Sequence, residues 1–438
     1  MDSIERIDSG PFSVPGRSRA QSATAVMLAA LSLAYLLSFF DRMLIVVVGE
    51  MVKREFLLSD KQLSLLTGAA FFIIYGVLGV GAGWLVDRSN RKRILIVALT
   101  LWSATTMVCG FAQSFSQLAY ARVGVGIGEA ALVPLAMSLL SDLYPPVKRP
   151  MVTAIFYASG MVGILATFLL GSWLAAHYGW RIAFFVAGPP GLVLALLIAL
   201  FATEPAREQS AIASPNAVQE VRSFHLVGTD RPLLWLLTGG AVSAFSNVGM
   251  MQWLPMFFIR SHHLDASGIG LLFGPALAGG MTAGMLLGGW LGNRIAARSV
   301  SAMIRFCTWI VISVIPMYLG VLTIASLPAA LSLMSVTMVL CALYTPVSTA
   351  AWQTICDPRA RGTAGGIAGF SSQLIGGAAC PFAIGALSDF WAPAFGADSL
   401  RYALMVGMAF CLIGAALFGR AAYLIRRMPD RSIKETRS

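Results

Sequence analysis

The chain has 438 residues, of which 57% are hydrophobic and 12% are charged, and its formal net charge is +11. A soluble protein of this length carries about 25% charged residues, so the composition excludes a soluble globular protein and indicates a polytopic membrane protein. The basic residues lie in short connectors between apolar runs, as in proteins that are oriented in a membrane, and this argues against nucleic acid as a partner.

Twelve apolar segments follow a polar tail at residues 1–22, and each is long enough for a tilted helix to span a bilayer. Six form an N-terminal bundle over 23–202, residues 203–231 form a polar linker, six more form a C-terminal bundle over 232–425, and 426–438 form a second tail. The segments are predicted at 23–49, 61–86, 93–112, 115–142, 150–176, 181–202, 232–259, 267–292, 300–323, 328–353, 363–388 and 400–425. The predicted fold class is an all-α integral membrane protein with twelve transmembrane helices.

The basic residues orient these segments. With residues 1–22 in the cytoplasm, 23 of the 31 basic residues fall on inside segments and six on outside ones. This asymmetry predicts that both tails and the linker are cytoplasmic. The excess of arginine over lysine favours a bacterial source, so we expect a multi-pass protein of a bacterial cytoplasmic membrane.

The two bundles are predicted to be repeats of one unit. The sequence GWLVDR at 83–88 follows the second segment, and GWLGNR at 289–294 follows the eighth, 206 residues later. Two six-helix units in the same orientation are typical of transporters that rock around a central site.

Three further motifs narrow the family. The twelve segments and GWLVDRSNRKR resemble the major facilitator superfamily. SFFDR in the first segment, ARVGVGIGEA in the fourth and FYASGMVG in the fifth resemble its Spinster branch, whose members carry lysophospholipids and sphingolipids. The resemblance implies the major facilitator fold and a secondary transporter that works by alternating access.

Four charged residues within the apolar segments are predicted to form a proton-coupling site: Asp41, Arg42, Arg122 and Glu129. Charges inside a spanning helix are costly and must face protein or water. Arg122 and Glu129 are two helical turns apart and share a face, so we expect a ladder of Asp41, Arg122 and Glu129. Arg42 points about 100° away from Asp41, and we expect it to reach the outer surface or the outer mouth. The alternative is a static ion pair that only orders the helices.

The loop after the second segment is predicted to act as an inner latch that holds the halves together when the outside is open. Its residues are Gly83, Asp87, Arg88 and Arg91, with Asn293 and Arg294 in the second copy. The alternative is that the loop only holds its side of the chain in the cytoplasm. The glycines of GVGIGEA, at 124, 126 and 128, are expected to serve helix packing.

The substrate is predicted to be an amphiphile, because one half of the chain supplies buried charges and the other supplies none within its helices. The expected substrate-binding residues are Arg122, Glu129, Phe71, Tyr75, Tyr157, Asn247, Trp253 and Gln373. A proton-coupled organic-anion or multidrug transporter of the same superfamily is the alternative. A channel or a membrane enzyme is less consistent with these motifs.

The predicted partners are this substrate, protons and the lipid bilayer, and we expect a monomer. The six cysteines form no Cys-x-x-Cys or Cys/His cluster, and no P-loop or HExxH motif occurs. We therefore expect no metal, no cofactor and no enzyme activity.

Overall fold

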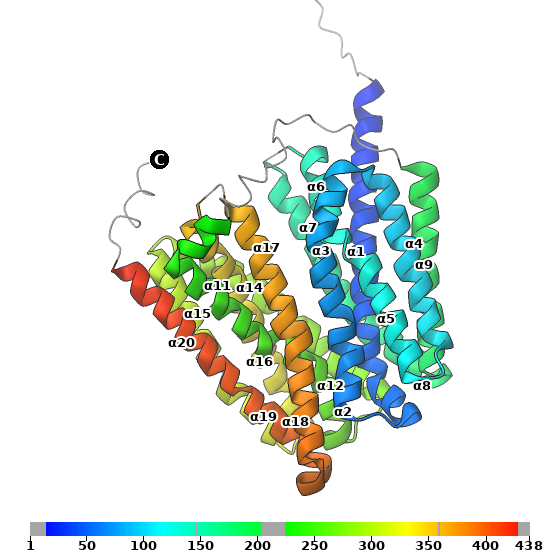
Figure 1. Cartoon of the computed structure of the whole chain (residues 1–438), viewed down its shortest axis with the longest axis vertical. Helices are drawn as coiled ribbons and strands as arrows, with labels where there is room; N and C mark the ends of the chain where they lie inside the picture. The colour runs from blue at the N-terminus through cyan, green and yellow to red at the C-terminus, as the bar shows by residue number, and fades with distance from the viewer. Residues whose placement is uncertain (1–14, 146, 203–223, 358–359, 428–438) are drawn as a thin grey trace, which may run out of the picture.

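The computed structural model describes residues 15–145, 147–202, 224–357 and 360–427, and this part of the chain is helical with short turns (Figure 1). All twelve predicted segments are helical. The tail at 1–14, most of the linker at 203–223 and the tail at 428–438 lie outside the described residues. The first helix begins at Pro15, before the predicted start at 23.

Several spanning segments of the N-terminal half are divided by a π-helical turn or a short break. The helices are α1 (Pro15–Phe56); α2 (Asp60–Ser64), η1 (Leu65–Ala69) and α3 (Ala70–Arg88); α4 (Arg91–Phe111); α5 (Phe115–Glu129) and α6 (Leu132–Leu143); α7 (Arg149–Ala166), η2 (Thr167–Gly171) and α8 (Ser172–Tyr178); and α9 (Trp180–Phe201).

The C-terminal half has the same plan. Its helices are α11 (Arg231–Ala244), η3 (Phe245–Gly249) and α12 (Met250–His262); α13 (Ala266–Gly268), η4 (Ile269–Phe273) and α14 (Gly274–Ala296); α15 (Val300–Thr323); α16 (Leu327–Ile355); α17 (Arg361–Ser372), η6 (Gln373–Ala379) and α18 (Cys380–Phe395); and, after the short turn η7 (Gly396–Asp398), α19 (Ser399–Gly407) and α20 (Ala409–Arg426).

Ten stretches of the described chain are long and apolar enough to cross a membrane. One of them, Arg361–Arg426, covers the last two predicted segments, and the seventh segment is not among the ten. Their side chains are compatible with lipid, and the helical conformation pairs backbone polar groups within each segment, as lipid requires.

The internal repeat is visible in the positions of the π-helical turns. η1 and η4 begin 204 residues apart, and η2 and η6 begin 206 residues apart. These offsets agree with the spacing of the two GWL motifs. The two halves therefore share a helix irregularity as well as a sequence motif.

Equivalent helices pack together in each half. α4 packs on α9 as α15 packs on α20, and α3 packs on α5 as α14 packs on α16. The halves meet where η1 contacts η6, where α2 contacts α18 and where η2 contacts η4. Figure 1 shows them close together near α2, α12 and α18 and farther apart toward the end at which α9 and α20 terminate.

The glycines of helix α5 permit close packing, as the sequence predicts. A Cβ atom on Gly128 would lie 2.7 Å from the backbone nitrogen of Trp102 in α4, and one on Gly126 would lie 3.0 Å from the carbonyl oxygen of Phe71. Backbone atoms cannot move aside at such distances. The close approach places α5 against α3 and α4, and with it the charged residues that α5 carries.

The substitution Gly128→Ala is expected to destabilise the protein by roughly 1–3 kcal/mol, because the new methyl group would overpack the contact between α4 and α5. Gly81→Ala in α3 is the matched control, because nothing lies within 4 Å of its Cβ position. Thermal unfolding of the purified protein should show a lower Tm only for Gly128→Ala. Equal melting of the two variants would contradict the packing role.

Candidate functional site

The first spanning helix lies in the interior of the protein. Every residue from Phe40 to Glu50 is buried, so α1 has no lipid-facing side over this stretch. Asp41 and Arg42 point in different directions, yet both meet protein, with exposed fractions of 2% and 6%. The expectation that Arg42 reaches the outer surface or mouth is therefore wrong, because it assumed that one side of the helix faces lipid or water.

Arg42 forms the buried ion pair of the site. Its Nη2 donates to Oε2 of Glu129 over 2.8 Å, and the hydroxyl of Ser38 donates to the same oxygen over 2.5 Å. Aromatic rings surround the guanidinium with centroids 4.7–5.7 Å from Cζ, and they belong to Phe39, Phe71, Phe72 and Tyr75. Such cation–π contacts strengthen when the cation is desolvated, so the rings partly replace water around Arg42.

Arg122 contacts the backbone of α1 instead of an acid. Its Nη1 donates to the carbonyl oxygen of Asp41 over 3.2 Å, and the hydroxyl of Thr106 donates to Oδ2 of Asp41 over 3.2 Å. Among the described residues, no ion pair within 4.0 Å joins Arg122 to Asp41 or Glu129. The predicted ladder is thus wrong in its pairing. The four charges lie together, but the cation that pairs with Glu129 is Arg42 and not Arg122.

The four charged side chains carry several buried atoms without a hydrogen-bond partner. These atoms are Oδ1 of Asp41, Nε of Arg42, Nε and Nη2 of Arg122 and Oε1 of Glu129. Unsatisfied polar atoms are rare in protein interiors, and charges in spanning helices are rarer still. Two cations and two carboxylates balance formally, so a proton on either acid leaves a guanidinium without its counter-charge. The arrangement can therefore link protonation to movement of side chains.

The expected substrate-binding aromatics of the first half lie beside this charged set. Phe71 is fully buried, stacks on Tyr75 with ring centroids 5.4 Å apart, and lies between Arg42 and Arg122. Tyr157 is 40% exposed and meets Tyr35 edge to face. Tyr75 and Tyr157 are thus the more accessible of these aromatics.

The expected substrate-binding residues of the C-terminal half differ in how far they are buried. Gln373 opens η6 and is half-buried. Trp253 is 1% exposed, and its Nε1 donates to the carbonyl oxygen of Pro381 over 3.0 Å, so it packs between α12 and α18 instead of facing an open wall. The side chain of Asn247 lies outside the described part of the structure.

A family model for the Major Facilitator Superfamily matches residues 31–381. The chain belongs to the major facilitator superfamily. It is therefore a multi-pass membrane transporter and not an enzyme, and its fold is the one that the sequence predicts.

Similar proteins support this assignment along nearly the whole chain. An MFS-type efflux pump of Mycolicibacterium smegmatis is 30% identical over 94% of this chain and 95% of the pump. A sphingosine-1-phosphate transporter of Danio rerio is 24% identical over 92% of this chain and 85% of that protein. A bacterial homologue of the human lysosomal transporter Spinster, solved in an inward-facing and unoccupied conformation, matches with a TM-score of 0.83 and 26% identity, over 97% of this chain and all of that one. The resemblance to the Spinster branch is confirmed.

The predicted inner latch does not join the halves of this transporter among the residues that can be placed. Arg91 donates to Asp142 over 2.5 Å and to Ser138 over 3.1 Å, so it links α4 to α6 within one half. Arg88, Asn293 and Arg294 are exposed, and Arg294 lies over the ring of Trp290 at 3.9 Å. Gly83 and Asp87 belong to α3, and the side chain of Asp87 lies outside what the structure describes. The latch is predicted for the conformation whose other side is open, so its role between the halves stays a prediction.

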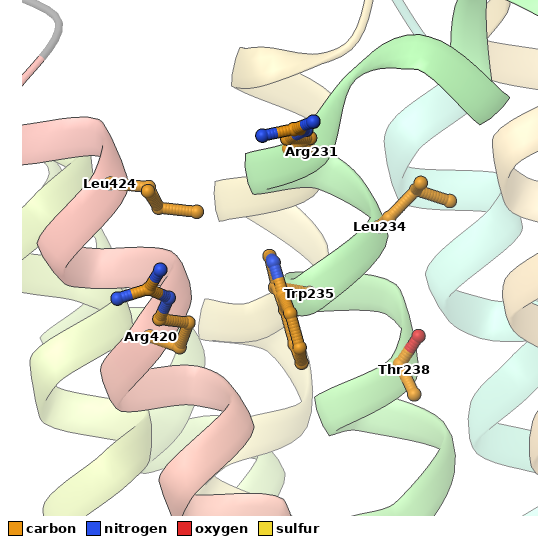
Figure 2. A pocket seen from close by; sticks show the side chains of 6 residues that line it. All are labelled: Arg231, Leu234, Trp235, Thr238, Arg420 and Leu424. Atoms are coloured by element: carbon orange, nitrogen blue, oxygen red, sulfur yellow. The ribbon is translucent and has the colours of Figure 1, made fainter.

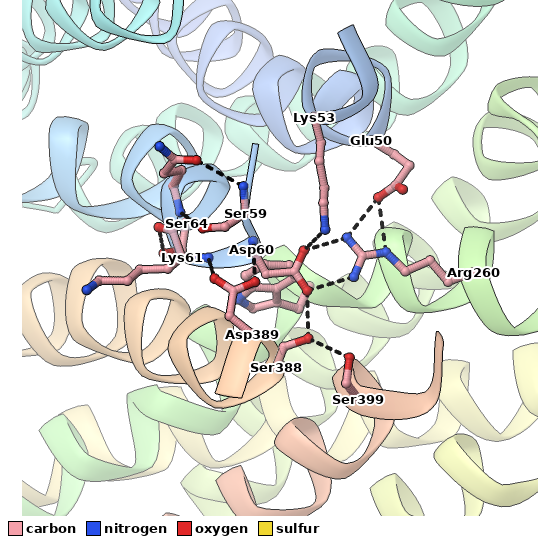
Figure 3. Close-up of polar contacts among 12 residues, drawn as sticks. Glu50, Lys53, Ser59, Asp60, Lys61, Ser64, Arg260, Ser388, Asp389 and Ser399 are labelled. Atoms are coloured by element: carbon pink, nitrogen blue, oxygen red, sulfur yellow. Dashed lines mark hydrogen bonds and ion pairs between the residues drawn. The ribbon is translucent and has the colours of Figure 1, made fainter. Parts of the chain in front are cut away.

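A cluster at the opposite end of the molecule does join the halves, as Figure 3 shows. Nη1 and Nη2 of Arg260 in α12 donate to the two carboxylate oxygens of Asp60 in α2, over 2.8 and 2.7 Å. Nε and Nη2 of the same guanidinium donate to Oε2 of Glu50 in α1, over 3.1 and 3.0 Å. Lys53 also pairs with Asp60. One arginine of the C-terminal half thus binds two acids of the N-terminal half.

Helix α18 completes this cluster from the C-terminal half. The carboxylate of Asp389 accepts from the backbone N–H groups of Asp60 and Lys61, each over 2.8 Å, and so caps the start of α2 across the interface. The hydroxyl of Ser388 donates to Asp60 over 2.6 Å. We call the residues that cross the interface here the outer lock: Glu50, Asp60, Arg260, Ser388 and Asp389.

Sequence reasoning missed the outer lock because it ended the first segment at residue 49 and began the second at 61, which left both acids in a loop. The helix α1 continues to Phe56 and α2 begins at Asp60. A usable signal was the set of six basic residues on the side that the sequence predicts to be outer, where cations are disfavoured. Five of these six form ion pairs: Lys53, Arg54, Arg181, Arg260 and Arg401.

The substitution Arg260→Gln is expected to open this side, because it removes the cation that bridges Glu50 and Asp60 and leaves Lys53 paired with Asp60 and the exposed Arg54 3.7 Å from Glu50. The cost of breaking such a largely buried set is roughly 1–3 kcal/mol, enough to shift the balance of conformations about fivefold or more. Spin labels at the exposed positions Gln113 and Ala397 would report a longer distance across the outer side.

Arg181→Gln is the matched control for this measurement. Arg181 also pairs with an outer acid, Glu55 at 2.6 Å, but both residues belong to the N-terminal half. Its loss should leave the label distance unchanged. If both substitutions lengthened the distance equally, the closure of the outer side would not depend on contacts between the halves.

Proposed function

We propose that this major facilitator couples protons to the transport of an amphiphilic, lipid-like substrate of the lysophospholipid or sphingoid type. The observation that carries the proposal is the buried pair of Arg42 and Glu129 beside Arg122, whose guanidinium retains two unpartnered nitrogens. Charged side chains within spanning helices cost free energy to insert into a membrane. Where they occur, they usually belong to proton relays or substrate sites.

Proton uptake is proposed to act on the pairing of α1 with α5. A proton on Glu129 removes the negative charge that holds Arg42, and the hydroxyl of Ser38 loses a charged acceptor. Asp41 offers a second acceptor through its unpartnered oxygen. The two acids lie on different helices, so their protonation changes the preferred distance between α1 and α5, and such a change shifts the balance between inward-open and outward-open states.

The outer lock is proposed to be the contact that must break for the outward-open state. The positive-inside rule places the linker and both tails in the cytoplasm of a bacterial cell, so the closed side of this structure is the outer one. The predicted inner latch around Asp87 would then form when the outer lock opens. We expect the protein to work as a monomer, because both halves of the transport unit lie on one chain.

The proposed substrate class rests on a contrast between the halves: the N-terminal half supplies the buried charges, and the C-terminal half supplies mainly apolar and weakly polar side chains. Arg122 can attract an anionic or zwitterionic head group through its spare N–H groups. Tyr75, Tyr157 and half-buried residues of η6 such as Gln373 offer apolar and weakly polar contacts for a hydrocarbon tail. A small hydrophilic ion would gain little from such a surface and would lose its hydration. The similarity to a sphingosine-1-phosphate transporter supports the same class.

A proton-coupled organic-anion or multidrug transporter is the alternative. It is favoured by the efflux pump of Mycolicibacterium smegmatis, which is 30% identical along almost the full length of both chains. The charged site serves either substrate class equally well. The dependence of binding on tail length distinguishes the two.

The double substitution Asp41→Asn and Glu129→Gln is expected to abolish the response of the conformational balance to pH. In the unaltered transporter, label distances across the outer side should change between pH 8 and pH 5. The double variant should give one distance distribution throughout this range. Asp398→Asn, which alters an acid in the turn before α19, is the control and should keep the response. An unchanged response in the double variant would refute proton coupling through these acids.

Affinity for lysophospholipids with one head group is expected to rise with tail length, by about 0.8 kcal/mol or roughly fourfold per buried methylene, until the site is full. Arg122→Ala should weaken every member of the series by a similar factor, because it removes a head-group contact. Binding to purified protein measures both effects. No dependence on tail length, together with tight binding of a short carboxylate or a drug, would favour the alternative.

A further inference from the structure

A groove on the surface of the C-terminal half lies between α11 and α20, and Figure 2 shows the side chains that line it. Its volume is about 420 Å³, and it is lined by Arg231, Leu234, Trp235, Thr238, Arg420 and Leu424. The principal contacts of α11 and α20 are with helices of their own half. The groove is therefore separate from the interface between the halves and from the charged site beside α1.

The groove carries two positive charges and no acid. Arg231 and Arg420 are both exposed, and neither forms an ion pair or a hydrogen bond within the part of the chain that the structure describes. The neighbouring acid, Asp230, is engaged as the N-cap of α11, where it accepts from the backbone N–H of Leu233 over 3.3 Å. A ligand at this site must therefore be anionic.

The depth of the groove matches the boundary between lipid head groups and tails. Arg231 is the first residue of α11, and Trp235 lies one turn, about 6 Å, further along it. Arg420 lies six residues before the end of α20, about 9 Å inside the helix. Tryptophan and arginine are typical of this boundary, and a cation inside the end of a spanning helix needs a counter-charge or must extend to the surface.

The apolar surface of the groove lies beside the two arginines, within one turn of the start of α11. Leu234 and Trp235 are 36% and 38% exposed, so both present large apolar surfaces beside the arginines. In Figure 2, Trp235 extends between α11 and α20, close to Arg420, while Arg231 lies nearer the end of α11. A free anion would leave these apolar surfaces unused, whereas a phospholipid covers them with its acyl chain.

We propose that this groove binds an anionic phospholipid of the surrounding leaflet. Its phosphate lies between Arg231 and Arg420, and an acyl chain starts against Leu234 and Trp235 and continues inward past Thr238. Basic pockets between spanning helices on the cytoplasmic side bind anionic head groups in this way. The bound lipid would connect α11 to α20 and so stabilise the packing of the C-terminal half.

The test is a titration of the purified full-length protein with phosphatidylglycerol and with phosphatidylcholine, read by native mass spectrometry. Each arginine should contribute about a fivefold preference for the anionic lipid, so Arg231→Gln with Arg420→Gln should weaken phosphatidylglycerol binding about twentyfold or more and leave phosphatidylcholine unchanged. Lys148→Gln with Arg298→Gln removes the same charge from exposed positions on the same side but outside the groove. This control should retain the preference.

Three results would overturn the proposal. The first is an equal loss of phosphatidylglycerol in the groove variant and the control, which would show a diffuse charge effect. The second is equal binding of the two lipids by the unaltered protein, which would show that both arginines extend to the surface without a ligand. The third is equal thermal stabilisation by inorganic phosphate and by phosphatidylglycerol vesicles, which would show recognition of the anion without the lipid.

Discussion

The pair of Arg42 and Glu129 can exist only where protein surrounds both side chains, because lipid solvates neither a guanidinium nor a carboxylate. This requirement explains why α1 is an interior helix. Aromatic rings of α1 and α3 cover the cation, and α5 brings the acid close enough for a 2.8 Å bond. The glycines of α5 permit that approach. The same close packing therefore joins the helices of the N-terminal half and positions its charges.

Helix α1 also connects the charged site to the outer lock. Arg42 and Glu50 lie eight residues apart on one continuous helix, or about 12 Å along its axis. The first pairs with α5 of the same half, and the second pairs with Arg260 of the other half. A tilt of α1 that follows a change at Glu129 therefore displaces Glu50 relative to α12. The transport cycle that we propose needs such a connection, and the continuous helix α1 offers one.

The closed side, which we propose to be the outer one, depends on polar contacts that water still reaches in part. Arg260 is buried against its acids without being sealed from solvent, and the cap of α2 by Asp389 consists of backbone hydrogen bonds that re-form readily. A fully buried set would be costly to break, and a fully exposed set would contribute little. Contacts of intermediate burial suit an interface that must open and close repeatedly.

The sequence by itself determined the membrane class, the twelve segments, the internal repeat and the family, because each of these depends on hydropathy, length and local motifs. It also identified all four charged residues of the central site, since a charge in an apolar run is conspicuous. Which cation binds Glu129 was decided only by the tertiary structure. The position of Arg42 on α1 does not reveal its partner until the helices that surround α1 are known. The outer lock was hidden for a related reason: Glu50, Asp60 and Arg260 lie at segment ends, where charges are common, and only the approach of the two halves makes them a single contact.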